Sequence, residues 1–270
     1  MIGIFDSGVG GLSVLRHVRR LLPAEDVVYV ADQAHVPYGP RPASEIHAFA
    51  DGITRFLRGE GVRLVVVACN TATAAALDGL RADFPDLPFV GMEPAVKPGA
   101  AETRSGLVGV LATAGTFESQ RYATLMARFA RGVTLLESPC EGLVPLIEAG
   151  RLAAPETEQL LRRCLEPMLS TGVDTVVLGC THYPFVLPLI RRIVGAKVKI
   201  IDPSPAVARQ ALRLLPHRQR AVARGAPPTG ALIAYTTGDP AALAALGERL
   251  LGYPLPTQRL IWRDGTLFRV

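Results

Sequence analysis

The chain has 270 residues, 49% of them hydrophobic, so it can bury the core of one large domain or of two small ones. Its formal net charge is +5, and its arginines are scattered over expected helix faces, for example at Arg16, Arg19 and Arg20. Because no aromatic residues interleave with them, solvated helix faces are favoured over a nucleic-acid-binding surface. The densest basic stretch, residues 217–225, is interpreted as a surface loop.

Neither a membrane-spanning segment nor a secretory leader is expected. No uninterrupted apolar run reaches the roughly eighteen residues that a membrane-spanning helix requires. The N-terminus, MIGIFDSGVGG, lacks the basic-then-apolar order of a signal peptide and is typical of a first strand and loop. We therefore expect a cytoplasmic protein without a membrane or nucleic-acid partner.

Short apolar runs alternate with longer amphipathic patterns along the chain. The runs are IGIF (2–5), DVVYVAD (26–32), RLVVVAC (63–69), LPFVG (87–91), GLVGVLA (106–112), VTLLES (133–138), DTVVLGC (174–180) and KVKIID (197–202). Helical patterns such as residues 11–22 and 44–61 separate most of them. Continuous apolar strands between amphipathic helices are typical of parallel sheets covered on both faces, so the predicted fold class is α/β.

Polar side chains follow several of these runs at the point where each strand should end. They are Asp6 and Ser7, Asp32, Cys69 with Asn70 and Thr71, Thr113 with Thr116, and Cys180 with Thr181 and His182. In parallel α/β sheets, ligands bind outside the carboxyl ends of the strands. These residues are therefore the first candidates for a functional site.

The four cysteines differ in their surroundings. No C-x-x-C pair occurs, so a zinc ribbon or a thioredoxin-type dithiol is poorly supported and no metal site is predicted. Cys164 lies in an amphipathic helical pattern and is interpreted as a packing residue. Cys140 is a weaker candidate for a functional thiol than Cys69 or Cys180. Cys69 and Cys180 each end an apolar run, which indicates a matched pair.

The chain also shows signs of an internal duplication. IGIFDSGVGG resembles VGVLATAG, and VVVACNTAT resembles VVLGCTHYP, at the similar offsets of 106 and 111 residues. Two similar halves would bring one thiol from each side toward a shared cleft, although α/β strands also resemble one another by composition alone. We predict a first domain of residues 1–96 plus about 208–270, a second of residues 97–207, and an active site in the cleft between them.

Two opposed thiols would suit inversion at a carbon atom. The start of a helix favours a thiolate, and proton-transfer groups work best when their pKa lies near the working pH. One thiolate would remove a proton from one face while the other thiol delivers a proton to the opposite face. A pyridoxal enzyme needs a lysine that forms a Schiff base. The chain has only Lys97, Lys197 and Lys199, and none of them lies in a polar cluster at the end of a strand, so the predicted mechanism uses no cofactor.

The combination of IGIFDSGVGGLSVL, ADQAHVPYGPRP, VVVACNTATAAAL, GVLATAGTFES, GLVPLIEAG and VVLGCTHYPFVLPLI resembles the glutamate racemases of bacterial cell-wall synthesis, from residue 2 to about residue 209. The resemblance implies two Rossmann-like (flavodoxin-like) domains related by pseudo-twofold symmetry. It implies cofactor-free interconversion of L- and D-glutamate that supplies peptidoglycan synthesis. Many such enzymes dimerise, so a homodimer is one expectation.

The resemblance also assigns roles to residues. It implies that Cys69 and Cys180 are the acid/base cysteines and that Asp6, Glu148 and His182 assist them. The substrate contacts it implies are Asp6, Ser7, Tyr38, Gly39, Asn70, Thr71, Thr113, Thr116, Thr181 and His182. The chain departs from the family pattern at Gln33, where the family has threonine. This difference concerns only the local conformation expected for the loop before Tyr38.

Three alternative functions stay open on the sequence. An aspartate racemase is the nearest alternative. The resemblance argues against it, because aspartate racemases tend to have an acidic residue where this chain has His182. A single-thiol hydrolase or decarboxylase would need only one essential cysteine. A redox-sensing or metal-binding protein could use Cys69 and Cys180 without catalysis.

Overall fold

The computed structural model describes residues 1–215 and 229–270, which form two compact units. Unit 1 comprises Met1–Met92 and Ser204–Val270, and unit 2 comprises Glu93–Pro203. The first unit is thus made of two separate chain segments. The basic stretch of residues 217–225 lies outside the described residues.

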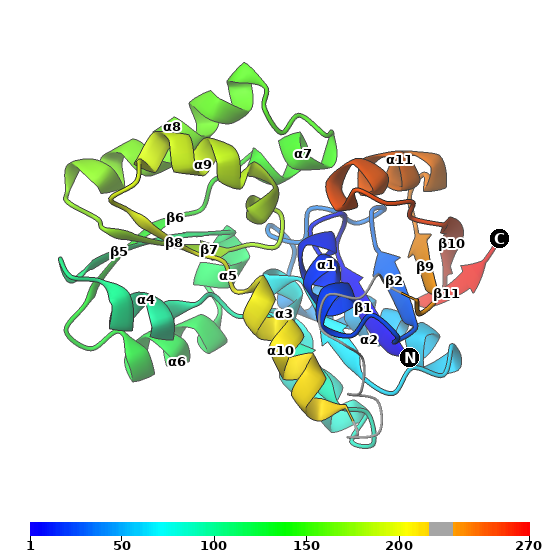
Figure 1. Cartoon of the computed structure of the whole chain (residues 1–270). Helices are drawn as coiled ribbons and strands as arrows, with labels where there is room; N and C mark the ends of the chain where they lie inside the picture. Colours follow the sequence, from blue (N-terminus) through cyan, green and yellow to red (C-terminus); the bar gives the residue numbers. More distant parts are fainter. Residues whose placement is uncertain (216–228) are drawn as a thin grey trace. The chain divides into compact units, whose positions relative to one another are not determined.

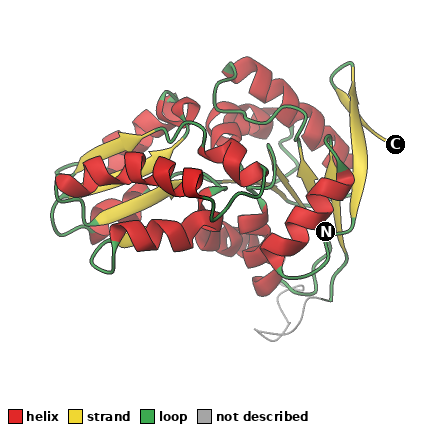
Figure 2. Cartoon of the chain, turned by 90° about the horizontal axis from the view of Figure 1, so that it is seen from above, coloured by secondary structure: helices red, strands yellow, loops and turns green. Residues whose placement is uncertain are grey.

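Unit 1 is built on one sheet, whose described strands have the order β11-β10-β9-β2-β1-β3-β4. The strands are β1 (Ile2–Asp6), β2 (Val27–Ala31), β3 (Val65–Val67), β4 (Phe89–Gly91), β9 (Leu232–Thr236), β10 (Thr257–Arg263) and β11 (Thr266–Arg269). All neighbours pair in parallel except β10 and β11, which form an antiparallel hairpin at the edge of the sheet, as Figure 2 shows. Strands β1, β2 and β3 are buried along their whole length, which explains their continuous apolar sequences.

The helices of unit 1 form two layers. They are α1 (Leu12–Leu21), α2 (Ala43–Gly59), α3 (Asn70–Asp83), α10 (Ser204–Leu214) and α11 (Pro240–Leu251). Helix α1 packs against α10 and α11, whereas α2 packs against α3 (Figure 1). Because parallel crossovers are right-handed, the reversal of strand order at β1 places α1 on one face of the sheet and α2 and α3 on the other.

Unit 2 repeats this plan on a smaller scale. Its described strands have the order β6-β5-β7-β8 and are all parallel: β5 (Leu107–Ala112), β6 (Thr134–Ser138), β7 (Thr175–Gly179) and β8 (Lys199–Ile201). The helices are α4 (Val96–Glu102), α5 (Ala114–Phe117), α6 (Gln120–Phe129), α7 (Leu143–Glu148), α8 (Pro155–Ser170) and α9 (Leu187–Val194), with a 3₁₀ helix, η1 (Tyr183–Val186). Figure 1 shows α8 and α9 on one face of the sheet and α4 and α6 on the other. The predicted α/β class with mostly parallel sheets is confirmed.

Strand pairing supports an internal duplication. The order β2-β1-β3-β4 matches β6-β5-β7-β8 position by position. The register matches as well: Gly3 pairs with Val65 in unit 1, and Gly109 pairs with Val176 in unit 2. Four residues after the partner of each glycine comes a cysteine, Cys69 in one unit and Cys180 in the other. Shared composition alone would not preserve this register.

The helix that follows the fourth strand is exchanged between the two halves of the chain. Helix α4 follows β4 but belongs to unit 2, where it packs on β7 and α6. Helix α10 follows β8 but belongs to unit 1, where it packs on α1 and β4. Both crossings carry the same tripeptide, Pro-Ala-Val, at residues 94–96 and 205–207. This exchange explains why unit 1 contains two chain segments.

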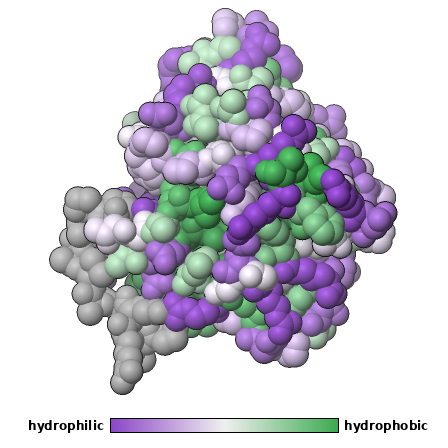
Figure 3. Space-filling view, turned by 90° about the vertical axis from the view of Figure 1, so that its right-hand side faces the viewer, coloured by the Kyte–Doolittle hydropathy of each residue, from purple (hydrophilic) through white to green (hydrophobic). Residues whose placement is uncertain are grey.

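The surface differs from the predicted one at Arg19. This residue is only 6% exposed, and its guanidinium donates hydrogen bonds to the carbonyl oxygens of Glu25, at 3.3 Å, and Gly230, at 2.7 Å. The expectation of a solvated arginine was therefore wrong here, because Arg19 joins the C-terminal segment to α1. Hydrophilic and hydrophobic residues are mixed on the face drawn in Figure 3. In the part of the chain that is described, no helix is both long and apolar enough to cross a membrane.

Two glycines of α2 test how closely the C-terminal hairpin packs on this helix. At Gly52 an added Cβ would lie 2.6 Å from the Trp262 ring and 2.7 Å from the carbonyl oxygen of Gly265. We therefore expect Gly52→Ala to lower the free energy of unfolding by about 1–3 kcal/mol, although alanine normally favours a helix.

Gly59, at the end of the same helix, is the matched control. No described atom lies within 4 Å of a Cβ added there, so Gly59→Ala should raise the free energy of unfolding by about 0.5 kcal/mol. Urea unfolding of both variants measures the difference. Effects of the same sign and size would contradict close packing at Gly52.

Candidate active site

Cys69 occupies the junction between a buried strand and a helix of unit 1. Strand β3 ends at Val67, and Cys69 is the N-cap of α3, which begins at Asn70. Its sulfur accepts a hydrogen bond from the backbone N–H of Ala72 at 3.4 Å, and the residue is 6% exposed. N-caps are usually Ser, Thr, Asp or Asn. A thiol in this place receives the N–H groups and the positive end of the helix dipole, which favour the thiolate.

Asp6 and Ser7 end the neighbouring strand, β1, and both are buried. The Asp6 carboxylate accepts a hydrogen bond from the backbone N–H of Gly8 at 2.9 Å. The N-cap of α1 is Gly11, which has no side-chain cap, so Asp6 holds the loop and does not cap this helix. A Cβ on Gly11 would lie 2.8 Å from that of Asp6, which explains the glycine at this position.

Asn70 and Thr71 form the buried first turn of α3. The Asn70 amide donates a hydrogen bond to the carbonyl oxygen of Met92 at 3.1 Å. Its side-chain oxygen has no hydrogen-bond partner among residues 1–215 and 229–270. A buried acceptor left unpaired costs free energy, so this oxygen is suited to accept a hydrogen bond from a ligand.

Tyr38 lies deeper than a substrate contact would suggest. The side chain is buried in the same hydrophobic cluster as Cys69, and its hydroxyl donates a hydrogen bond to Asp32 at 2.7 Å. Burial and the Asp32 carboxylate raise the pKa of Tyr38 well above its usual value. The next residue, Gly39, is partly exposed. The hydroxyl of Tyr38 is therefore engaged inside the protein.

Unit 2 places Cys180, His182 and Glu148 in one chain of contacts. Cys180 follows β7 and is 6% exposed. Its sulfur lies 3.7 Å from Nδ1 of the buried His182, whose Nε2 lies 2.6 Å from Oε1 of Glu148. Glu148 comes from the end of α7, 34 residues away along the chain, and its side chain is 12% exposed. Glu148 is thus not a solvated helix residue.

The same contacts determine the charge of His182. Burial opposes a charged ring, but hydrogen bonds with Cys180 and Glu148 and the charges of both partners raise the pKa of His182 well above its usual value. The imidazolium form is therefore favoured at neutral pH. The ring therefore places a positive charge 3.7 Å from the sulfur of Cys180.

The remaining predicted residues also lie at strand ends of unit 2. Thr113 follows β5 at the position that corresponds to Ser7 in the duplication, and its hydroxyl lies 3.1 Å from that of Thr116. Thr116 and Thr181 are both buried. Unit 1 thus contains the predicted residues Asp6, Ser7, Tyr38, Gly39, Cys69, Asn70 and Thr71, and unit 2 contains Thr113, Thr116, Glu148, Cys180, Thr181 and His182.

Two features were missed by the sequence analysis. Asp32 was noted as a strand end but not as a site residue, and it accepts four side-chain hydrogen bonds. Cys164 was interpreted as a packing residue, but its thiol shares a hydrogen bond with Cys140, which lowers the pKa of Cys164 to about 7. Only the carboxylate after a buried strand was visible as a signal in the sequence. In the described residues, no group of three or more His, Cys, Asp or Glu side chains could hold a metal ion.

Known proteins resemble this chain over most of its length. The sequence model of the Asp/Glu/Hydantoin racemase family matches residues 2–211. The glutamate racemase of Ectopseudomonas mendocina is 51% identical over 251 residues, which cover 93% of this chain and 94% of that protein. The crystal structure of glutamate racemase isoform RacE1 from Bacillus anthracis superposes with a TM-score of 0.86 at 30% identity, with 98% of each chain covered.

A third relative was solved with a ligand. The Escherichia coli glutamate racemase, in complex with L-glutamate and the activator UDP-MurNAc-ala, has a TM-score of 0.82 at 34% identity, and 96% of each chain is covered. Family match, sequence identity and fold therefore agree over nearly the whole chain. The chain belongs to the Asp/Glu/Hydantoin racemase family.

Proposed function

We propose that this chain interconverts L- and D-glutamate without a cofactor, and that Cys69 and Cys180 are the two acid/base groups. The observation that carries the proposal is the equivalent position of the two thiols. Each follows the third strand of a duplicated four-strand unit in the same register, and each has its own group that favours a thiolate. The high identity to glutamate racemases supports glutamate as the substrate.

The reaction requires one proton to leave the α-carbon and another to arrive. The thiolate of one cysteine removes the α-proton, and the thiol of the other donates its proton to the opposite face of the planar carbanion. The first cysteine is then a thiol and the second a thiolate, so the enzyme is ready for the reverse reaction. Reacting atoms must approach to about 3–3.5 Å, so the two sulfurs would flank the substrate roughly 7 Å apart.

The surrounding groups tune the two thiols differently. In unit 1 the start of α3 favours the Cys69 thiolate, and the buried Asp6 carboxylate at the neighbouring strand end can accept a proton from the thiol. In unit 2 the Glu148–His182 pair supplies a positive charge beside Cys180. Proton transfer by a positioned group of this kind contributes about 10²–10⁴-fold to a rate.

Neutral groups at the strand ends are suited to bind the substrate. The hydroxyls of Ser7, Thr71, Thr113, Thr116 and Thr181 can donate hydrogen bonds to the substrate carboxylates. The unpaired side-chain oxygen of Asn70 can accept a hydrogen bond from the ammonium group of the substrate. Because the Tyr38 hydroxyl is engaged with Asp32, contacts from the Tyr38-Gly39 segment would use its main chain. In the cytoplasm such an enzyme would supply D-glutamate for peptidoglycan.

Substitution of each cysteine tests the two-base assignment. Cys69→Ser and Cys180→Ser should each lower racemisation at least ~10²-fold, because a hydroxyl is a far weaker acid than a thiol. Circular dichroism of glutamate measures the rate. Cys164→Ser is the matched control and should keep wild-type activity, since this thiol belongs to the middle of α8 and does not follow a strand. Wild-type activity in either of the first two variants would refute the assignment.

Turnover in deuterated water distinguishes one base from two. With two bases the product receives its hydrogen from a solvent-exchanged thiol, so early product carries deuterium while recovered substrate does not. Mass spectrometry of the separated enantiomers gives both fractions. Equal deuterium in substrate and product from the first turnovers would indicate a single shared base.

Glu148→Gln tests the charge on His182. Loss of the carboxylate should lower the pKa of His182, so the imidazolium beside Cys180 is lost at a lower pH. His182 is charged below its pKa, so the alkaline limb of the kcat/KM profile should move to lower pH in this variant. On that limb, kcat/KM should fall about tenfold for each unit by which the pKa of His182 is lowered. Glu141→Gln, an exposed residue just before α7, is the control. A loss that is constant across pH would contradict this role.

A further inference from the structure

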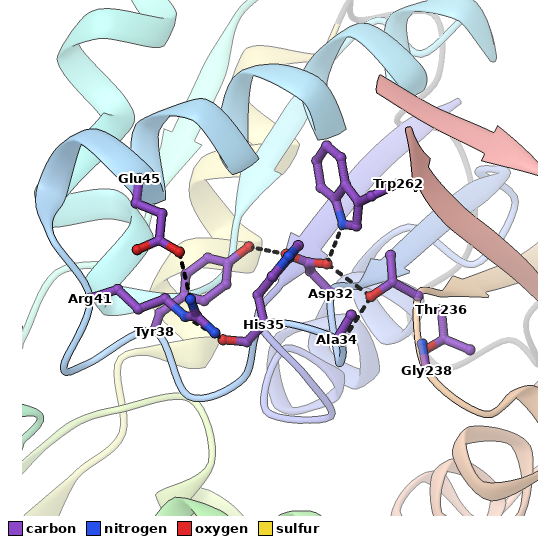
Figure 4. A network of polar contacts seen from close by, with 10 residues as sticks. Asp32, Ala34, His35, Tyr38, Arg41, Glu45, Thr236, Gly238 and Trp262 are labelled. Atoms are coloured by element: carbon purple, nitrogen blue, oxygen red, sulfur yellow. Dashed lines mark hydrogen bonds and ion pairs between the residues drawn. The ribbon is translucent and has the colours of Figure 1, made fainter. Parts of the chain in front are cut away.

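Asp32 carries an unusually well-satisfied carboxylate in unit 1. It follows β2, is 0% exposed, and is bound by the four side-chain donors of His35, Tyr38, Thr237 and Trp262 at 2.7–2.8 Å. Figure 4 shows Tyr38, His35 and Trp262 converging on it. A buried carboxylate is stable only if its oxygens are satisfied, and here both are.

The donors come from opposite ends of the chain. His35 and Tyr38 belong to the loop after β2, whereas Thr237 and Trp262 lie 205 and 230 residues farther on. The Nε1–H of Trp262, in β10, donates to Oδ1, and the Tyr38 hydroxyl donates to Oδ2. Asp32 therefore connects the C-terminal hairpin to the loop that contains Tyr38.

Further contacts hold the same loop to the C-terminal segment. The Thr237 hydroxyl accepts a hydrogen bond from the backbone N–H of Ala34 at 2.9 Å. The Thr236 hydroxyl donates one to the side-chain oxygen of Gln33 at 2.8 Å. Gln33, which departs from the family pattern, thus has a C-terminal partner in this chain. The His35 ring stacks on Phe49 with 3.9 Å between ring centroids.

The loop in turn borders the candidate site. The Tyr38 ring and Cys69 belong to one buried cluster, so a shift of the ring changes the surroundings of the thiol. The backbone N–H of Asp32 also donates a hydrogen bond to the carbonyl oxygen of Asp6 at 3.0 Å. Asp32 therefore contacts both the end of β1 and a side chain, Tyr38, that belongs to the same buried cluster as Cys69.

We propose that Asp32 and Trp262 are positioning residues of the active site, and that Trp262 orients the Asp32 carboxylate that holds Tyr38 and the Tyr38-Gly39 main chain in place. The inference rests on the proposed racemase function. It assigns a role to a hairpin that lies beyond residue 211, where the match to the family ends. Neither residue touches the reacting atoms, and both act through Tyr38.

A double-mutant cycle tests the connection. Trp262→Phe keeps an aromatic ring but removes the N–H donor, and Tyr38→Phe keeps the ring beside Cys69 but removes the hydroxyl. Each single substitution should raise KM for both enantiomers about three- to tenfold, with a smaller change in kcat. In the Tyr38→Phe background, Trp262→Phe should add less than about twofold, because its route to the site is already broken.

Arg263→Gln, the neighbouring exposed residue of β10, is the matched control and should leave KM unchanged. An unchanged KM in Trp262→Phe, or single effects that multiply in the double variant, would overturn the proposal. If Trp262 had only a structural role, its substitution would lower the free energy of unfolding without raising KM more than it changes kcat.

Fluorescence separates the inference from the proposed function, because Trp262 is the single tryptophan of the chain. Tyr38→Phe should change the emission of Trp262 through Asp32, whereas Arg249→Gln, an exposed substitution on α11, should not. If the wild-type chain fails to racemise glutamate, the proposed function is wrong, and this emission still decides the connection. Identical emission in wild type and Tyr38→Phe would overturn it.

Discussion

A thiol held between the end of a buried parallel strand and the first turn of a helix is the arrangement on which this protein depends. Parallel strands buried on both faces must be apolar, so the first polar position is the one that follows the strand. When a helix begins there, its free N–H groups meet the side chain at that position. At Cys69 this side chain is the N-cap itself. The fold therefore creates a place where the backbone of the helix start favours a thiolate.

Duplication turns one such place into two. The matching strand order and register put Cys69 and Cys180 at equivalent positions, but the two halves have diverged in the groups that lie beside each sulfur. Unit 1 uses the helix start, while unit 2 uses a charged His182 held by Glu148. Two proton-transfer groups with different supports can be tuned separately. The proposed mechanism uses this difference, because it has each thiol act as base in one direction and as acid in the other.

The fold and much of the candidate site could be derived from the sequence because they depend on local patterns. Continuous apolar runs predicted the parallel strands, and the residue after each run predicted Asp6, Cys69 and Cys180. Contacts between distant segments could not be predicted in this way. The pairing of Glu148 with His182 and the Asp32–Trp262 hydrogen bond depend on packing between elements, and no periodicity in the sequence encodes it. The burial of Arg19 could not be predicted for the same reason, since one of its two partners, Gly230, comes from the C-terminal segment.

A crystal structure with bound D-glutamate tests the central claim most directly. The account predicts that the sulfurs of Cys69 and Cys180 lie on opposite faces of the substrate α-carbon, each at about 3–3.5 Å from it. Both sulfurs on the same face, or one of them far from the α-carbon in a closed complex, would contradict the account.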